Sequence, residues 1–236
     1  AEPRMNELYL ANRNLSETYR QTLQGEKSTL HPSETFSGET DINPQKYYLD
    51  FKDRALRFVH NKTELLKKEC LQSENSHLIL LKQTALVDTI VQAAFTSALW
   101  FFNLHNKKDL AEETVPLAIL ARGGYGREEM YFRSDVDIQI VSQASLEDEK
   151  KKWTEEIIGH FEYLFIFQNI FPASGNSCYT ESESFGKDLS QENITQFLVL
   201  LEHRFVAGNI SVYKEFINSI KTVSLMHQEE ITKHCL

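Results

Sequence analysis

Two aspartates separated by one residue, Asp135 and Asp137, are the first side chains in this sequence that indicate chemistry. They open a β-branched run, DVDIQIV, of the kind that forms a strand. In an extended strand, side chains two residues apart point to the same face, roughly 7 Å apart along the backbone. Carboxylates are ligands that Mg²⁺ prefers, with phosphate and water completing its shell. The pair therefore predicts a site for Mg²⁺ or Mn²⁺ with a nucleoside triphosphate.

A glycine turn precedes the aspartates. The apolar run 116–121 predicts a strand that leads into Gly123 and Gly124. Without Cβ, these residues can adopt positive φ and let N–H groups approach phosphate oxygens, next to the N-terminus of a short helix expected at 126–130. Each feature alone is more often a plain β-turn or a pair of solvated aspartates. Together, in this order and spacing, they favour nucleotidyl transfer, in which metal ions orient phosphate, attacking hydroxyl and leaving pyrophosphate.

The segment GGYGREEMYFRSDVDIQIV resembles the signature of the DNA polymerase β-like nucleotidyltransferase superfamily, a Gly-Gly or Gly-Ser turn followed by Asp-x-Asp on the next strand. It is more closely similar to the motif of bacterial protein-PII uridylyltransferase/uridylyl-removing enzymes, Gly-Gly-Tyr-Gly-Arg-Gly-Glu-Leu and then Ser-Asp-Ile-Asp. The matching positions are Gly123, Gly124, Tyr125, Gly126, Arg127, Glu129, Ser134, Asp135 and Asp137. Fainter similarity at 86–94, at 175–180 and at 201–208, which corresponds to a helix in that family, extends the resemblance over residues 80–210.

The resemblance implies Mg²⁺-dependent transfer of a uridylyl group from UTP to a tyrosine of a PII-type signalling protein, a reaction of nitrogen regulation. It implies that Asp135 and Asp137 hold the metal and act in catalysis. Gly123 and Gly124 would hold the β- and γ-phosphates of UTP or of another nucleoside triphosphate. Fold and metal site do not determine the acceptor, so an adenylyltransferase or small-molecule nucleotidyltransferase of the same fold stays open.

Two further residues of the motif have open roles. Ser134 or Arg127 would contact phosphate or stabilise the turn. A guanidinium suits phosphate, but Arg127 could equally lock the turn by pairing with Glu129. Glu128 stands where the family has glycine, and a negative charge beside a phosphate turn opposes nucleotide binding.

A third carboxylate is missing from the expected place. Many members of the superfamily carry it on a later strand as the base that accepts the hydroxyl proton, yet residues 175–180 contain no acid. The nearest acids, Glu181, Glu183 and Glu202, are each expected to be solvated surface residues, and we assign no general base. The alternative from another class is therefore a catalytically silent, nucleotide-binding or regulatory module of the same fold.

Composition limits the remaining classes. The chain of 236 residues carries a net charge of −9, which argues against a dedicated nucleic-acid polymerase because such proteins usually have a basic face. The basic run 150–152 is flanked by acids and is typical of a solvated helix face. Three distant cysteines fit a reducing cytoplasm, and no uninterrupted apolar run approaches the ~20 residues that a membrane span needs. We expect a cytoplasmic protein with no membrane or nucleic-acid partner.

Hydrophobic periodicity predicts helices at 6–23, 45–72, 77–103, 147–168, 193–207 and 211–234, a polar linker at 25–44, and strands at 116–121, 135–142 and 173–180. This order predicts an α+β fold, a small mixed β-sheet nucleotidyltransferase core flanked by N- and C-terminal helices. We expect a helical N-terminal region (1–110), the core (111–185) and C-terminal helices packed on the core (186–236). A hydrolytic HD-type domain and ACT domains follow the transferase unit in the similar family, so we expect either a fragment or a minimal relative.

Overall fold

The structure is a computed structural model of the chain. It describes residues 2–31, 36, 42–73, 75–171, 178–181, 197, 201–228 and 231–232. The helices are α1 (Glu2–Glu26), the 3₁₀ helix η1 (Lys27–Leu30), α2 (Pro44–Gln72), α3 (Ser76–Asn106), α4 (Gly123–Gly126), α5 (Asp148–Phe165) and α7 (Ile210–Met226). The strands are β1 (Leu117–Arg122), β2 (Ile138–Ser142), β3 (Cys178–Glu181) and β4 (His203–Gly208).

Local sequence sets the boundaries of the long helices. The side chain of Asn43 accepts hydrogen bonds from the backbone N–H groups of Gln45 and Lys46, and Pro44 takes the first helical position, so α2 begins there. Asn75 caps α3 in the same way through the N–H of Leu78. At its other end, α3 stops where the backbone turns left-handed.

The strands form one mixed sheet in the order β3-β2-β1-β4. Central β1 pairs antiparallel with both β2 and β4, whereas β3 runs parallel to β2. With helices before and after this sheet, the predicted α+β fold with a small mixed sheet is confirmed. The proposed division of the chain at 110/111 and 185/186 stays a prediction.

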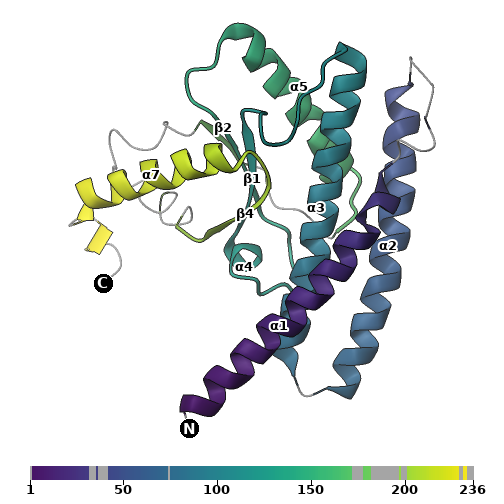
Figure 1. Cartoon of the computed structure of the whole chain (residues 1–236), viewed down its shortest axis with the longest axis vertical. Helices are drawn as coiled ribbons and strands as arrows, with labels where there is room; N and C mark the ends of the chain where they lie inside the picture. Colours follow the sequence, from purple (N-terminus) through teal and green to yellow (C-terminus); the bar gives the residue numbers. More distant parts are fainter. Residues whose placement is uncertain are drawn as a thin grey trace.

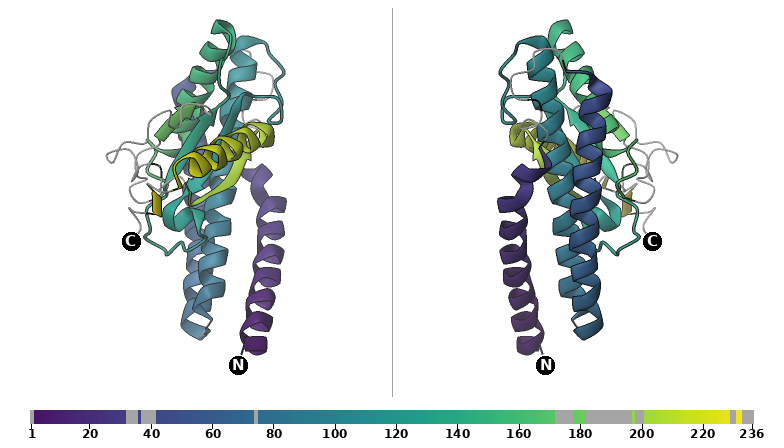
Figure 2. Two further views of the ribbon diagram at one scale, coloured as in Figure 1. Left: turned by 90° about the vertical axis from the view of Figure 1, so that its left-hand side faces the viewer. Right: turned by 90° about the vertical axis from the view of Figure 1, so that its right-hand side faces the viewer.

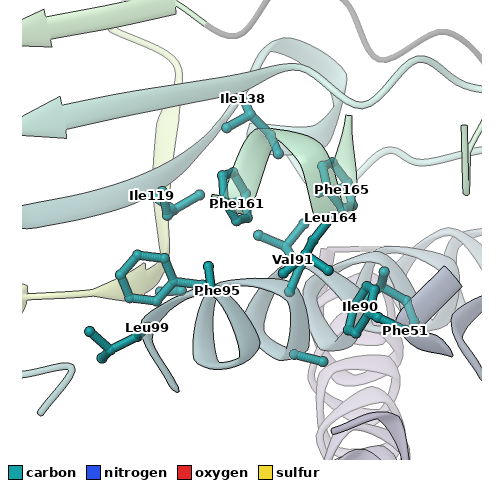
Figure 3. Packing of buried hydrophobic residues seen from close by; sticks show 14 of the residues in the cluster. Phe51, Ile90, Val91, Phe95, Leu99, Ile119, Ile138, Phe161, Leu164 and Phe165 are labelled. Carbon is teal, nitrogen blue, oxygen red and sulfur yellow. The ribbon is translucent and has the colours of Figure 1, made fainter. Parts of the chain in front are cut away.

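The two faces of the sheet are covered by different helices, as Figure 2 shows. Ile119 and Ile138 face α3 and α5, where they meet Val91, Phe95 and Phe161 in the main core (Figure 3). Ala118, Leu120 and Val141 face α7 in a smaller cluster. Alternate residues of β1 therefore serve both layers, which explains why the strand reads as a continuous apolar run.

Helix α3 is the central helix of the fold. It is long and apolar enough to cross a membrane by length and composition, but 83% of its most apolar window is buried inside the protein. α1, α2 and α5 all contact it (Figure 1). Its apolar character is accounted for by this burial.

Four local predictions need correction. The helix predicted at 193–207 is wrong at its end, because residues 203–208 form β4. Pairing of these residues with the edge of β1 outweighs their predicted helical preference. The short helix is α4 at 123–126 rather than 126–130, and β2 begins after both aspartates. The linker predicted at 25–44 contains η1 and the buried residues Leu30, Phe36 and Ile42. Of the strand predicted at 173–180, residues 178–180 lie in β3, and 173–177 lie outside the described residues.

Candidate active site

The turn after β1 has the predicted left-handed backbone conformation at the first of its two glycines. Gly123 has a φ of 53°, in the left-handed region that favours glycine. A Cβ at this position would lie 3.1 Å from Oδ2 of Asp137, so the aspartate side chain lies directly against the turn. Gly124 has no positive φ, and a Cβ there would meet only the Arg127 guanidinium, at 4.0 Å. Gly123 is therefore the residue that the turn requires.

The two aspartates lie immediately before β2, beside this turn. The backbone N–H of Arg122 donates to the carbonyl oxygen of Asp137 at 3.0 Å, which continues the β1–β2 ladder by one step. Asp137 is half-buried and Asp135 is exposed. Neither carboxylate has a hydrogen bond or ion pair to another residue in the part of the chain that the structure describes. Two uncompensated carboxylates beside a glycine turn suit a hard cation that also binds phosphate.

Arg127 has partners within the fold. Its Nε donates to Oε2 of Glu129 at 2.8 Å, and its Nη1 pairs with Glu202, just before β4. The structure thus contains the turn-locking pair with Glu129. Because the side chains are largely exposed, each pair contributes little to stability.

Ser134 closes the loop that leads to the aspartates. Its Oγ accepts a hydrogen bond from the backbone N–H of Tyr131 at 2.9 Å, and its own N–H donates to the Tyr131 carbonyl at 3.2 Å. Of its two predicted roles, the stabilising one has this direct geometric support. A contact with phosphate stays a prediction.

The surroundings of Glu128 account for an acid at the position where the similar family has glycine. Its φ is 62°, a backbone conformation in which glycine is usual. Its carboxylate is ion-paired with Arg13 and with Arg20, both on α1. The charge that was expected to oppose phosphate is therefore largely neutralised by these two arginines.

The sequence analysis did not identify one residue of the candidate site. Arg122 ends β1 opposite Asp137, so the two side chains belong to the same face of the sheet. Its Nε is buried and has no hydrogen-bond partner, and it forms no ion pair with another described residue. A cation at the end of a buried apolar strand was the available signal, because burying a charge is unfavourable without a compensating interaction.

The candidate bases are only partly described. Glu202 is engaged with Arg127, Glu181 ends β3 next to β2, and Glu183 lies outside the described residues. Within the described chain, no group of three or more acidic, histidine or cysteine side chains is arranged to hold a metal ion. The geometry thus brings Asp137 against the turn, with Asp135 two residues before it, and none of the described residues is identified as a third acid.

Comparisons with known proteins agree with this arrangement. Residues 72–180 match the sequence model of a family described as "Putative nucleotidyltransferase DUF294". These residues include α3, the glycine turn and both aspartates. The part of the chain that holds the glycine turn and both aspartates is therefore similar to a family of nucleotidyltransferases.

Curated relatives are bifunctional uridylyltransferase/uridylyl-removing enzymes. The protein from Cereibacter sphaeroides is 33% identical over 137 residues, which are 58% of this chain and 14% of the relative. That from Zymomonas mobilis is 27% identical over 168 residues, 69% of this chain and 16% of the relative. The matched region is thus a small part of these relatives. Its similarity to uridylyltransferase enzymes confirms the resemblance found in the sequence.

Proposed function

We propose that this chain transfers a nucleoside monophosphate from a metal-bound triphosphate to a protein hydroxyl group. The specific case is transfer of UMP from UTP to a tyrosine of a PII-type signalling protein. The observation that carries the proposal is the left-handed turn at Gly123 directly against the Asp137 carboxylate, with Asp135 two residues away. The relatives' uridylyltransferase name supports the choice of UTP. Consumption of a nucleoside triphosphate fits a cytoplasmic protein.

The chemistry would be a single displacement. The acceptor oxygen attacks the α-phosphorus, the bond to pyrophosphate breaks, and the hydroxyl proton leaves to water or a base. Asp135 and Asp137 would hold Mg²⁺ or Mn²⁺, which supplies charge neutralisation for the phosphates. The N–H groups of Gly123 and Gly124 open α4 and so have no partner within that helix, which leaves them available to the β- and γ-phosphates.

A second candidate is a nucleotide-binding module without transfer. It is favoured by the two-carboxylate set, because no third metal-binding acid joins it among the described residues. It is also favoured by Glu202, whose carboxylate is already paired with Arg127. Both candidates share nucleotide binding and differ only in release of pyrophosphate.

The test uses the full chain, Mg²⁺, each of the four ribonucleoside triphosphates labelled at the α-phosphate, and a PII-type protein. We expect one nucleotide to raise the melting temperature, to release pyrophosphate and to label the acceptor on tyrosine. A rise in melting temperature without pyrophosphate release, from neutral to mildly alkaline pH, would select the binding module. Absence of any metal-dependent nucleotide effect would contradict both candidates.

A further inference from the structure

A buried carboxylate on α3 connects three distant parts of the chain. Asp88 is 1% exposed and accepts a hydrogen bond from the Tyr125 hydroxyl at 2.7 Å. Arg204 of β4 donates to both carboxylate oxygens, at 2.9 Å each, and Arg20 of α1 donates to Oδ2. One side chain therefore joins α1, α4 and β4 through charge-assisted hydrogen bonds.

Two guanidinium groups keep Asp88 ionised within this cluster. Burial opposes ionisation of Asp88, but the guanidinium groups of Arg204 and Arg20 outweigh it and lower the pKa of the carboxyl below its usual value. Burial and the neighbouring Asp88 charge raise the pKa of Tyr125 well above its usual value, so its hydroxyl keeps its proton and donates. The Arg204 guanidinium also lies 5.4 Å from the centre of the Tyr125 ring.

Tyr125 anchors the turn because it lies inside α4, directly after the two glycines. Its side chain is 1% exposed, and its carbonyl accepts from the Glu128 N–H at 3.2 Å. The next residue, Gly126, packs closely against backbone, since a Cβ there would lie 2.9 Å from the carbonyl oxygen of Glu202 and 3.1 Å from that of Ala121. The position of α4 is thus set by the tyrosine on one side and by backbone on the other.

Helix α1 reaches the turn twice. Arg20 bonds to Asp88 and also lies 3.6 Å from Glu128, which Arg13 pairs with independently. Figure 1 shows α1 crossing α3 beside α4. Arg13 therefore acts on this region through Glu128 alone, whereas Arg20 also completes the set of donors around Asp88.

We propose that Asp88 is a positioning residue for nucleotide binding. It holds the glycine turn through the Tyr125 hydroxyl. Because Arg20 of α1 donates to the same carboxylate, the position of α1 also affects the position of the turn. The inference rests on the proposed function. Asp88 does not touch the nucleotide. Its effect is transmitted through Tyr125 to the N–H groups that open α4.

The first test compares two tyrosines. Tyr125→Phe removes the hydroxyl that Asp88 holds, and Tyr47→Phe removes an equally buried hydroxyl that donates to the Ser97 carbonyl at 2.9 Å. Each loses one buried hydrogen bond, so both variants should melt roughly 2–4 °C lower. Only Tyr125→Phe should raise the KM for nucleotide, by about fivefold, with kcat nearly unchanged. Equal KM values in the two variants would overturn the proposal.

The second test separates docking of α1 from the role of Arg20. Arg20→Gln removes a donor to Asp88, whereas Arg13→Gln removes only a contact with Glu128 and a contact within α1. We expect the nucleotide KM to rise in Arg20→Gln and to recover in Arg20→Lys. The rise in Arg13→Gln should be smaller, because that change exposes part of the Glu128 charge but leaves the donors to Asp88 in place. Equal effects of Arg20→Gln and Arg13→Gln would contradict the assignment to Asp88.

A measurement without nucleotide keeps this inference separate from the proposed function. The N–H groups of Arg127 and Glu129 donate to the Gly123 and Gly124 carbonyls, at 2.9 and 2.8 Å, and report on closure of the turn. Their hydrogen exchange should be faster in Tyr125→Phe than in Tyr47→Phe. If wild-type protein transfers no nucleotide, the proposed function fails, but this difference would still support the positioning role. Identical exchange in the two variants would overturn the inference even for an active enzyme.

Discussion

Asp88 and the pair Asp135–Asp137 are carboxylates on two sides of one glycine turn, and they differ in their partners. Asp88 is buried and accepts hydrogen bonds from a tyrosine and two arginines. Asp135 and Asp137 are more accessible and have no partner among the described residues. Loss of a carboxylate whose partners are buried leaves their charges uncompensated, whereas two adjacent carboxylates without partners among the described residues gain most from an external cation.

The largest expected effect is on transfer. Asp137→Asn or Asp135→Asn should reduce nucleotidyl transfer by roughly 100-fold or more, because each removes a charged ligand of the metal that stabilises the transition state. Unfolding in urea should show unchanged or slightly higher stability, since the two carboxylates repel each other in the absence of metal. Retained transfer in either variant would contradict the assignment of the metal site.

Asp88 should show the opposite pattern in stability. Asp88→Asn leaves Arg20 and Arg204 without their buried counter-charge, so the free energy of unfolding should fall by about 3–5 kcal/mol. Urea unfolding of the two variants, Asp88→Asn and Asp137→Asn, measures the contrast directly. Similar stabilities would show that the distinction between the two kinds of carboxylate is wrong.

The pH dependence sharpens the same contrast. The pKa of Asp88 is lowered in the folded protein, so its contribution to stability is present above the usual aspartate pKa of about 4 and is lost as pH falls below it. The difference in stability between wild-type protein and Asp88→Asn should therefore narrow in acid. Urea unfolding at neutral pH and at pH values below the usual aspartate pKa checks this. A constant difference would indicate that Asp88 does not act through its charge.

Substitutions at the two turn glycines should differ in their effects on stability and on nucleotide binding. Gly123→Ala forces a Cβ into a left-handed backbone and against the Asp137 carboxylate, which should cost about 1–2 kcal/mol of stability and weaken nucleotide binding. Gly124→Ala places its Cβ 4.0 Å from the Arg127 guanidinium, an ordinary van der Waals contact, and should cost less. Thermal melting with and without Mg²⁺ and nucleotide compares the two. A greater loss in Gly124→Ala would mean that the second glycine is the critical one.

At Arg122 the expected effect is on nucleotide binding alone. The Nε of Arg122 has no hydrogen-bond partner among the described residues. If the guanidinium receives phosphate, Arg122→Gln should raise the KM for nucleotide by roughly 10-fold, within the range for one charge-assisted hydrogen bond. Stability should change little, because no ion pair to a described residue is lost. Arg57→Gln, an exposed change on α2, is the control for general loss of positive charge. Equal KM values would exclude Arg122 from the phosphate site.

Local signals were sufficient for the chemistry of the turn. A glycine at a position of positive φ, an apolar strand before it and Asp-x-Asp after it each follow from a few neighbouring residues, and Gly123 and Asp137 are found together. The long apolar helix α3 could also be predicted from the sequence, because its residues are buried on nearly all sides. The site residues that the sequence indicated are thus those whose roles depend on backbone conformation or on adjacent side chains.

Only the tertiary structure decided which distant residues interact with one another. Asp88 is an acid within an apolar helix, and its partners Tyr125, Arg20 and Arg204 lie 37, 68 and 116 positions away. Residues 203–208 have an apolar pattern that suits a helix, yet the open edge of β1 makes them a strand. Glu128 seemed opposed to phosphate until α1 supplied its arginines. Pairing across such distances depends on how packed elements meet, and the sequence alone carries no local signal for it.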